Sequence, residues 1–171
     1  MAGRGITVAE AEPRDRVALA ALLAEMGRLH GERTDAATIG AAAEALSTPC
    51  GRAGPFCLLA RLNGAPAGLV SLSGFFPALG FTWGLLLKDI FVAEAARRTG
   101  TARALMAEAM RFAAVQGYSR VEWSTEPAND RARALCATLG IAPAGGIFYR
   151  LVGEALTAAA QGRWPATQEA P

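Results

Sequence analysis

The chain has 171 residues, the length of one compact domain. Hydrophobic residues make up 52% of it and charged residues 19%, a composition typical of a folded globule rather than a disordered segment. The 17 basic and 15 acidic side chains leave a net charge of +2 without a long basic run, so a nucleic-acid partner is not predicted.

The cysteines and the single histidine do not have the spacing of metal ligands. The cysteines are Cys50, Cys57 and Cys136, an odd number that favours a reducing compartment. The opening residues lack the pattern of a secretory signal, and no apolar run reaches the length of a membrane span. We therefore expect a cytoplasmic protein with no metal site and no membrane partner.

The first third of the chain is predicted to hold one strand and two helices. Residues 6–11 have a strand pattern, and apolar residues from Val17 to Met26 recur at helical spacing. Asp15 is a candidate cap for that helix. An alanine-rich segment over residues 35–46 predicts a second helix that ends before a proline.

The following segment is predicted to form antiparallel strands. Strand patterns over residues 56–62 and 67–73 flank Asn63 and Gly64, which form a hairpin turn because both residues tolerate positive φ. Residues 84–92 are almost continuously apolar, which is typical of a strand that is buried on both faces.

The second half alternates helices and strands. An amphipathic helix is predicted from Ala102 to a stop at Gly117, a strand over residues 120–125, and a further helix from Ala132 that ends at Gly140. A final strand is expected over residues 148–152.

These elements predict an α+β fold with a mixed sheet. Antiparallel strands come first, a strand–helix–strand unit forms the centre, and the remaining helices flank the sheet. We expect one domain over residues 1–153. The tail over residues 154–171 is expected to be loosely structured or to contact another copy around Trp164.

The connection between the central strand and the central helix has the residues of a phosphate-binding loop. Gly100 would let the backbone approach a ligand, and the free N–H groups of the helix start suit a pyrophosphate. Arg97, Arg98 and Arg103 would add positive charge. An ordinary helix start with solvated arginines explains the same residues. The glycine motifs of nucleotide kinases and dinucleotide dehydrogenases are absent from the sequence.

Two motifs resemble one known family. Arg97-x-x-Gly100-x-Ala102, directly after a Leu-x-Asp-x-Phe-Val strand, resembles the R/Q-x-x-G-x-G/A signature of the GNAT N-acetyltransferase superfamily. The segment from Asn129 to Gly140 resembles the family's N-x-x-A-x-x-L-Y-x-x-x-G-F segment. The likeness is clearest over residues 68–140, and its closest flavour is that of the spermidine/spermine and thialysine acetyltransferases.

The resemblance implies a fold, a cosubstrate and a reaction. It implies a single GNAT domain that binds acetyl-CoA and transfers the acetyl group to a primary amine of a small molecule by direct attack in a ternary complex. A homodimer is possible, as is common in the family. By the same resemblance, the cosubstrate would contact Ile90, Phe91, Val92, Arg97, Arg98, Thr99, Gly100, Thr101, Ala102, Arg103 and Asn129.

Within this set each segment has a separate expected role. The main chain at Ile90, Phe91 and Val92 would pair with the pantetheine arm, and the loop that ends at Arg103 would wrap the pyrophosphate. Asn129 would reach the pantetheine arm, or it would only cap the helix that follows it.

The catalytic residues are less well defined by the sequence. Asp89 is a candidate base, although a strand aspartate is usually satisfied by local hydrogen bonds, and Lys88 stands where the polyamine-type enzymes have an acid. Cys136 replaces the tyrosine that protonates the CoA sulfur in the family; it could donate a proton, but a small core residue is favoured. The weaker candidates are Glu122, Glu126 and His30.

Three other functions remain open at this point. They are a protein or peptide N-acetyltransferase, a catalytically weak GNAT-like protein that binds CoA, and an interaction module with no affinity for acetyl-CoA. An aromatic segment before the central strand either packs in the core or lines the acceptor site. Its aromatic members are Phe75, Phe76, Phe81 and Trp83.

Overall fold

The computed structural model describes residues 5–48, 51–145 and 150–164, and the chain divides into two compact units, Met1–Gly140 and Ile141–Pro171. The strands are β1 (Ile6–Glu10), β2 (Phe56–Leu62), β3 (Ala65–Ala78), β4 (Thr82–Val92) and β5 (Val121–Glu122). The helices are α1 (Arg16–Leu29), α2 (Ala36–Ser47), α3 (Thr101–Val115), α4 (Asp130–Thr138) and α5 (Gly153–Ala160), with short 3-10 turns at Pro13–Asp15 and Glu94–Ala96.

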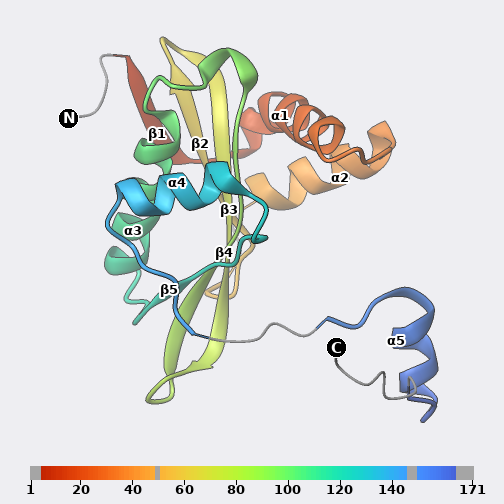
Figure 1. Cartoon of the computed structure of the whole chain (residues 1–171). Helices are drawn as coiled ribbons and strands as arrows, with labels where there is room; N and C mark the ends of the chain where they lie inside the picture. Colours follow the sequence, from red (N-terminus) through yellow and green to blue (C-terminus); the bar gives the residue numbers. More distant parts are fainter. Residues whose placement is uncertain (1–4, 49–50, 146–149, 165–171) are drawn as a thin grey trace. The chain divides into compact units, whose positions relative to one another are not determined.

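The strands form one mixed sheet in the order β1-β2-β3-β4-β5 (Figure 1). The first four strands pair with one another in antiparallel fashion, whereas β5 is parallel to β4 and is connected to it through α3. The α+β fold, the antiparallel first strands and the central strand–helix–strand unit are therefore confirmed.

Helices cover both faces of this sheet. On one face α3 packs Leu105 and Phe112 against strand residues such as Leu72. On the other face α1 and α2 enclose a second core that includes Leu19 and Phe91 (Figure 1). Since side chains alternate along a strand, consecutive apolar residues of β2 and β3 serve both cores, which explains why these strands are almost continuously apolar.

One predicted turn forms as expected, whereas a predicted helix cap forms only in part. Asn63 and Gly64 both have positive φ, 51° and 84°, in the turn between β2 and β3. Asp15 occupies the predicted N-cap position of α1, but its side chain forms no cap hydrogen bond to this helix. Asp15 instead accepts a hydrogen bond from the Glu12 N–H at 3.0 Å and forms an ion pair with Arg61 at 2.6 Å.

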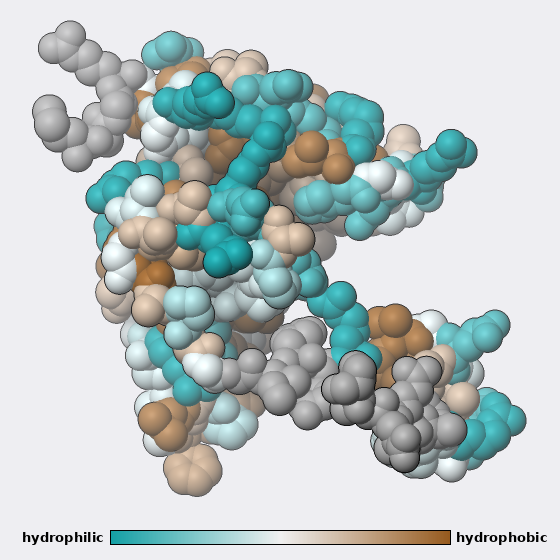
Figure 2. All heavy atoms as spheres, viewed as in Figure 1, coloured by the Kyte–Doolittle hydropathy of each residue, from teal (hydrophilic) through white to brown (hydrophobic). Residues whose placement is uncertain are grey.

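The aromatic segment predicted to pack in the core or line a site forms the far end of the β3–β4 hairpin. The rings of Phe76 and Trp83 lie 5.5 Å apart across the two strands. Phe81 is 84% exposed and Leu79 is 83% exposed. Figure 2 shows hydrophobic residues gathered at this end of the hairpin. Trp83 packs beside the α3 core, whereas the tip is solvent-exposed within its unit.

The end of the chain differs from the sequence prediction. Residues 154–160, expected to be loosely structured, lie in α5. Of the final strand expected over residues 148–152, residues 148 and 149 lie outside the described part, and Arg150–Val152 has no regular secondary structure. The strand expected over residues 120–125 is reduced to Val121–Glu122. The domain boundary after residue 153 stays a prediction. Within the described residues, the helices are too short or too polar to cross a membrane.

Candidate functional site

Strand β4 changes its register with β3 in the middle of its length. Asp89 lies opposite Ser71, but Leu87 lies opposite Leu72, so Lys88 is an extra residue that forms a bulge. Because of this extra residue, the side chains after the bulge point to the opposite sheet faces from those that an unbroken alternation along β4 would give. At the end of the strand, a Cβ added to Gly68 would lie 2.5 Å from the Phe91 oxygen, so the glycine permits close pairing of β3 with β4 there.

The opposite edge of β4 is open beyond the bulge. Its ladder with β5 consists of Leu85 with Val121 and Leu86 with Glu122. From residue 87 to residue 92 this edge has no strand partner in the part of the chain that the structure describes. The main chain at Ile90, Phe91 and Val92 therefore belongs to an exposed strand edge, which can pair with an extended ligand as an added strand would.

The loop between β4 and α3 holds an unusual backbone conformation. Arg98 has φ of 64° and Gly100 has φ of 94°, both in the left-handed region. A left-handed arginine costs conformational energy, and such strain is concentrated at functional sites. The Thr99 hydroxyl holds the loop in place through contacts of 2.7 Å with the Ala96 carbonyl and with the hydroxyl of Thr101, which is buried.

Helix α3 begins directly after this loop with free donors. Gly100 is its N-cap residue, and among the described residues no side chain caps the helix. The N–H groups of the first turn, from Thr101 to Arg103, therefore keep their hydrogen-bonding capacity, and the helix dipole adds partial positive charge at the same place. An anion is the ligand that such a helix start favours.

A cavity of about 260 Å³ lies at this helix start. Its lining residues are Val92, Ala96, Arg97, Arg98, Gly100, Thr101, Ala102, Arg103 and Leu135. Arg97 and Arg98 have no ion-pair partner within residues 5–48, 51–145 and 150–164. The cavity thus combines unpaired positive charge with the open helix start, and both features attract a phosphate.

Helix α4 contributes one wall of the cavity through Leu135, which the sequence analysis did not single out. The Arg103 guanidinium donates a hydrogen bond of 3.4 Å to the Thr138 carbonyl, which links α3 to the end of α4. Asn129 caps α4 by accepting from the Ala132 N–H at 3.1 Å. It does not line the cavity, and neither does Thr99.

The candidate base Asp89 lies on the face of the sheet that α1 and α2 cover. It shares this face with Phe91, two residues further along β4, whereas Ile90 and Val92 point to the α3 side. The Ser71 hydroxyl donates a hydrogen bond of 2.9 Å to Asp89 Oδ2. One of the two carboxylate oxygens of Asp89 is therefore bonded within the sheet.

Cys136 is half-buried rather than fully buried. In α4 the residues that pack against the sheet core are Leu135 and Leu139, and Cys136 lies beside them on the helix without lining the cavity. The small core residue that the sequence analysis favoured is therefore only partly enclosed. By contrast, Cys57 is buried in β2, and burial raises the pKa of its thiol to about 12, which makes it unreactive.

The weaker catalytic candidates lie in ordinary surroundings. Glu122 forms an ion pair of 2.8 Å with Arg120, and Glu126 and His30 are exposed. Neither Glu126 nor His30 lines the cavity at the α3 start. Within the described residues, no group of three or more histidine, cysteine or acidic side chains is placed to hold a metal ion.

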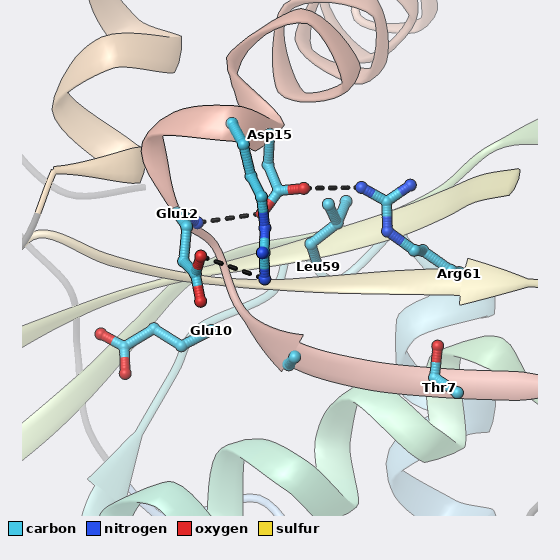
Figure 3. A pocket seen from close by; sticks show the side chains of 8 residues that line it. Thr7, Glu10, Glu12, Asp15, Leu59 and Arg61 are labelled. Atoms are coloured by element: carbon cyan, nitrogen blue, oxygen red, sulfur yellow. Dashed lines mark hydrogen bonds and ion pairs between the residues drawn. The ribbon is translucent and has the colours of Figure 1, made fainter. Parts of the chain in front are cut away.

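A second cavity, of about 380 Å³, lies at the β1 edge of the sheet (Figure 3). Its two arginines are neutralised, since Arg61 pairs with Asp15 at 2.6 Å and Arg14 pairs with Glu12 at 3.0 Å. Burial acts to raise the pKa of Asp15, but the Glu12 N–H and Arg61 together outweigh it and lower the pKa below its usual value. The paired charges make this cavity a structural junction between β2 and the start of α1.

Comparisons with known proteins identify the family of the chain. The acetyltransferase (GNAT) family matches residues 23–141, more than half of the chain. No curated protein sequence matches significantly. Among solved structures, the chain is similar to an integron cassette protein from the mobile metagenome of V. cholerae, with 18% identity and a TM-score of 0.78, over 93% of this chain and 99% of that chain.

Two further structures have similar folds. A ribosomal-protein-alanine N-acetyltransferase from Brucella melitensis biovar Abortus 2308 is 22% identical with a TM-score of 0.73, over 86% of this chain and 99% of that chain. The aminoglycoside N-acetyltransferase AAC(6')-Iy in complex with CoA is 19% identical with a TM-score of 0.71, over 85% and 94%. At these identities the likeness establishes the fold. The family match establishes more: the chain belongs to the acetyltransferase (GNAT) family and is an N-acetyltransferase.

Proposed function

We propose that the chain transfers an acetyl group from acetyl-CoA to the primary amine of a small molecule, by direct attack within a ternary complex. The transfer forms a bond between the amine nitrogen and the acetyl carbon and breaks the bond from that carbon to sulfur. An ammonium acceptor gives up two protons in total, and the departing thiolate takes up one. The protein's task is to position both reactants and to accept the remaining proton.

The observation that carries the proposal is the unpaired positive charge at an uncapped helix start. Arg97 and Arg98 have no described ion-pair partner, and the α3 start beside them lacks a side-chain cap. Neighbouring positive charges repel each other unless a ligand supplies a negative counter-ion. The pyrophosphate of a CoA molecule supplies two negative charges, and the glycine at position 100 leaves the main chain accessible to it.

The open edge of β4 supports the placement of the pantetheine arm. Ile90, Phe91 and Val92 lie on that edge, and Val92 also lines the cavity at the helix start. A ligand that extends from the cavity along this edge therefore reaches the bulge at Lys88. Acetyl-CoA would supply an activated thioester there, and a main-chain N–H near Phe91 would polarise its carbonyl.

Asp89 and Cys136 are the candidates for proton transfer, with unequal support. Asp89 lies in the same strand as the proposed thioester site and is half-buried. Cys136 lies on α4, outside the cavity lining. We assign Cys136 a packing role, and we expect the departing thiolate to be protonated from solvent.

A direct test measures binding and turnover separately. Acetyl-CoA at about 100 times its Kd should stabilise the fold by about 2.7 kcal/mol, which raises the Tm by about 5 to 10 °C. ATP at the same concentration is the control for nonspecific phosphate binding. Absence of a shift with millimolar acetyl-CoA would contradict the proposal and favour an interaction module.

Turnover then distinguishes the functions that share acetyl-CoA binding. Free thiol release is measured with monoamines, polyamines, aminoglycosides and peptides that have a free N-terminus. Turnover of the monoamines supports the proposal, and turnover of peptides alone would establish a protein-directed enzyme. A melting shift without turnover of any amine would indicate a CoA-binding protein of weak activity.

The assembly and location of the protein are part of the same proposal. We expect a homodimer in the cytoplasm, with the relationship to spermidine/spermine and thialysine acetyltransferases limited to the motifs in residues 68–140. Light scattering after size-exclusion chromatography measures the mass in solution, and a single-chain mass at micromolar concentration would contradict the dimer.

A further inference from the structure

Ser71 is a buried polar residue at a position where the fold does not need a polar side chain. It lies in the middle of β3 on the face covered by α1 and α2, two residues from the buried Leu69, and it is only 8% exposed. An alanine or valine would fill the same place in a strand without the cost of burying a hydroxyl. Its hydroxyl makes one described side-chain contact, the hydrogen bond of 2.9 Å to Asp89 Oδ2.

The bulge is what brings the two residues together. Because Lys88 is the extra residue, Asp89 lies directly opposite Ser71 and their side chains point to the same face. Without the bulge the register would place another residue of β4 opposite Ser71. The pair therefore stands beside the point where β4 becomes an open edge.

The bond occupies only one side of the carboxylate. Asp89 Oδ1 receives no hydrogen bond from any residue that the structure describes, and Asp89 is half-buried. A carboxylate oxygen that accepts from no protein donor and remains accessible can accept from a ligand N–H group, above all from an ammonium.

The remaining acid of strands β3 to β5 is already neutralised. Along these three strands the acidic residues are Asp89 and Glu122, and Glu122 is paired with Arg120 at 2.8 Å. These strands therefore offer one unpaired carboxylate, which matches an acceptor with one ammonium group better than a polycation.

We propose that Ser71 is a positioning residue for the acceptor amine. By donating to Oδ2 it fixes the Asp89 carboxylate in one orientation and leaves Oδ1 free to accept from the acceptor's ammonium. This inference rests on the proposed acetyl transfer and adds to it the residue that orients the amine and the preference for a monoamine.

The test uses substitutions of Ser71 that separate the hydroxyl from the shape. Threonine and valine have nearly the same shape and both suit a strand, but only threonine keeps the hydroxyl. Ser71→Val and Ser71→Ala should raise the KM for a monoamine about tenfold, since a hydrogen bond to a charged group is lost. Ser71→Thr should stay near the unaltered protein. The KM for acetyl-CoA and the melting shift with acetyl-CoA should not change in any of the three.

A matched control lies two residues further along the same face. Ser73 is half-buried in β3, is paired with Leu86, and makes no hydrogen bond to Asp89. Ser73→Ala should leave the monoamine KM unchanged. Calorimetric titration of the monoamine into the complex with CoA, which does not react, gives the same ranking from binding alone.

The outcomes separate this inference from the proposed function. Equal monoamine affinity in Ser71→Thr and Ser71→Val, with normal turnover, would overturn the role of Ser71 and leave the acetyl transfer intact. Better turnover of spermidine than of a monoamine would overturn the monoamine preference in the same way. If the unaltered protein neither binds acetyl-CoA nor turns over any amine, the proposed function fails and this inference fails with it.

Discussion

Helices α3 and α4 cover the same face of the sheet, yet they begin in different ways. The N-cap of α3 is Gly100, with φ of 94° and no side-chain cap. The N-cap of α4 is Asn129, whose side chain accepts from the Ala132 N–H at 3.1 Å. A helix start that is satisfied by its own side chain has less capacity for a ligand, whereas an uncapped start keeps its donors free. We therefore expect the anion site at the start of α3 rather than at the start of α4.

The charged residues around the two helix starts also differ. Arg97 and Arg98 stand unpaired before α3 among the described residues, while at the start of α4 Arg133 lies 3.7 Å from Asp130. The same contrast separates the two cavities, since the arginines of the β1-edge cavity are both paired (Figure 3). Two adjacent arginines without a described counter-ion therefore distinguish the α3 start from the α4 start, where the acid Asp130 lies beside Arg131, and from the β1-edge cavity.

The largest expected effect comes from adding a side chain at the α3 start. Gly100→Val should abolish the melting shift with acetyl-CoA, because a left-handed valine is strained and the loop must change its conformation to relieve it. Space alone is not the reason, since an added Cβ would meet only Ile6 Cδ1 at 3.9 Å.

Gly140→Val is the matched control for this strain. Gly140 follows α4 with φ of 72° and has open space around it, so valine there has a similar conformational cost. Both variants should lose about 1 to 2 kcal/mol of stability. Only Gly100→Val should lose acetyl-CoA binding. An equal melting shift with acetyl-CoA in both variants would show that the phosphate loop lies elsewhere.

The second effect reverses one charge at each helix. Arg98→Glu should raise the Kd for acetyl-CoA at least tenfold, because a carboxylate would replace an unpaired cation beside the pyrophosphate. Arg131→Glu reverses an exposed charge in the first turn of α4 and should change the Kd by less than about twofold. Isothermal titration at two salt concentrations makes the comparison, and similar losses in the two variants would indicate a long-range charge effect.

The third effect separates the two roles of Asn129. Asn129→Ala should lower the free energy of unfolding by about 1 kcal/mol through loss of the cap, whereas Asn129→Asp keeps a capping oxygen and should retain the stability. Both remove the amide donor that would reach the pantetheine arm, so both should weaken acetyl-CoA binding by about fivefold. Unchanged affinity in Asn129→Asp would leave the cap as the only role of this residue.

The smallest expected effect is at Cys136. Cys136→Ala should keep turnover within about twofold and change stability by less than about 1 kcal/mol, because the side chain is only half-buried and lies outside the cavity lining. The rate is measured against pH for both proteins. A loss of about 100-fold together with loss of the alkaline limb would make Cys136 the proton donor after all.

The sequence by itself determined the types of the elements from β1 to α4 and the loop before α3, whereas α5 was not predicted. The apolar periods of 3.6 and 2, the Asn63-Gly64 turn and the strand–helix–strand order all depend on residues close together in the chain, so local rules predict them. Gly100 was predictable for the same reason, because its backbone freedom and its place before a helix are both local properties.

Only the tertiary structure decided which distant residues meet. The Lys88 bulge and the pairing of Ser71 with Asp89 depend on the register between two strands, and rules that use only nearby residues do not predict that register. Asp15 binds Arg61, 46 residues away, instead of capping its own helix. A local cap would give the Asp15 carboxylate one hydrogen bond. The partly buried ion pair with Arg61 and the hydrogen bond from the Glu12 N–H together stabilise it more.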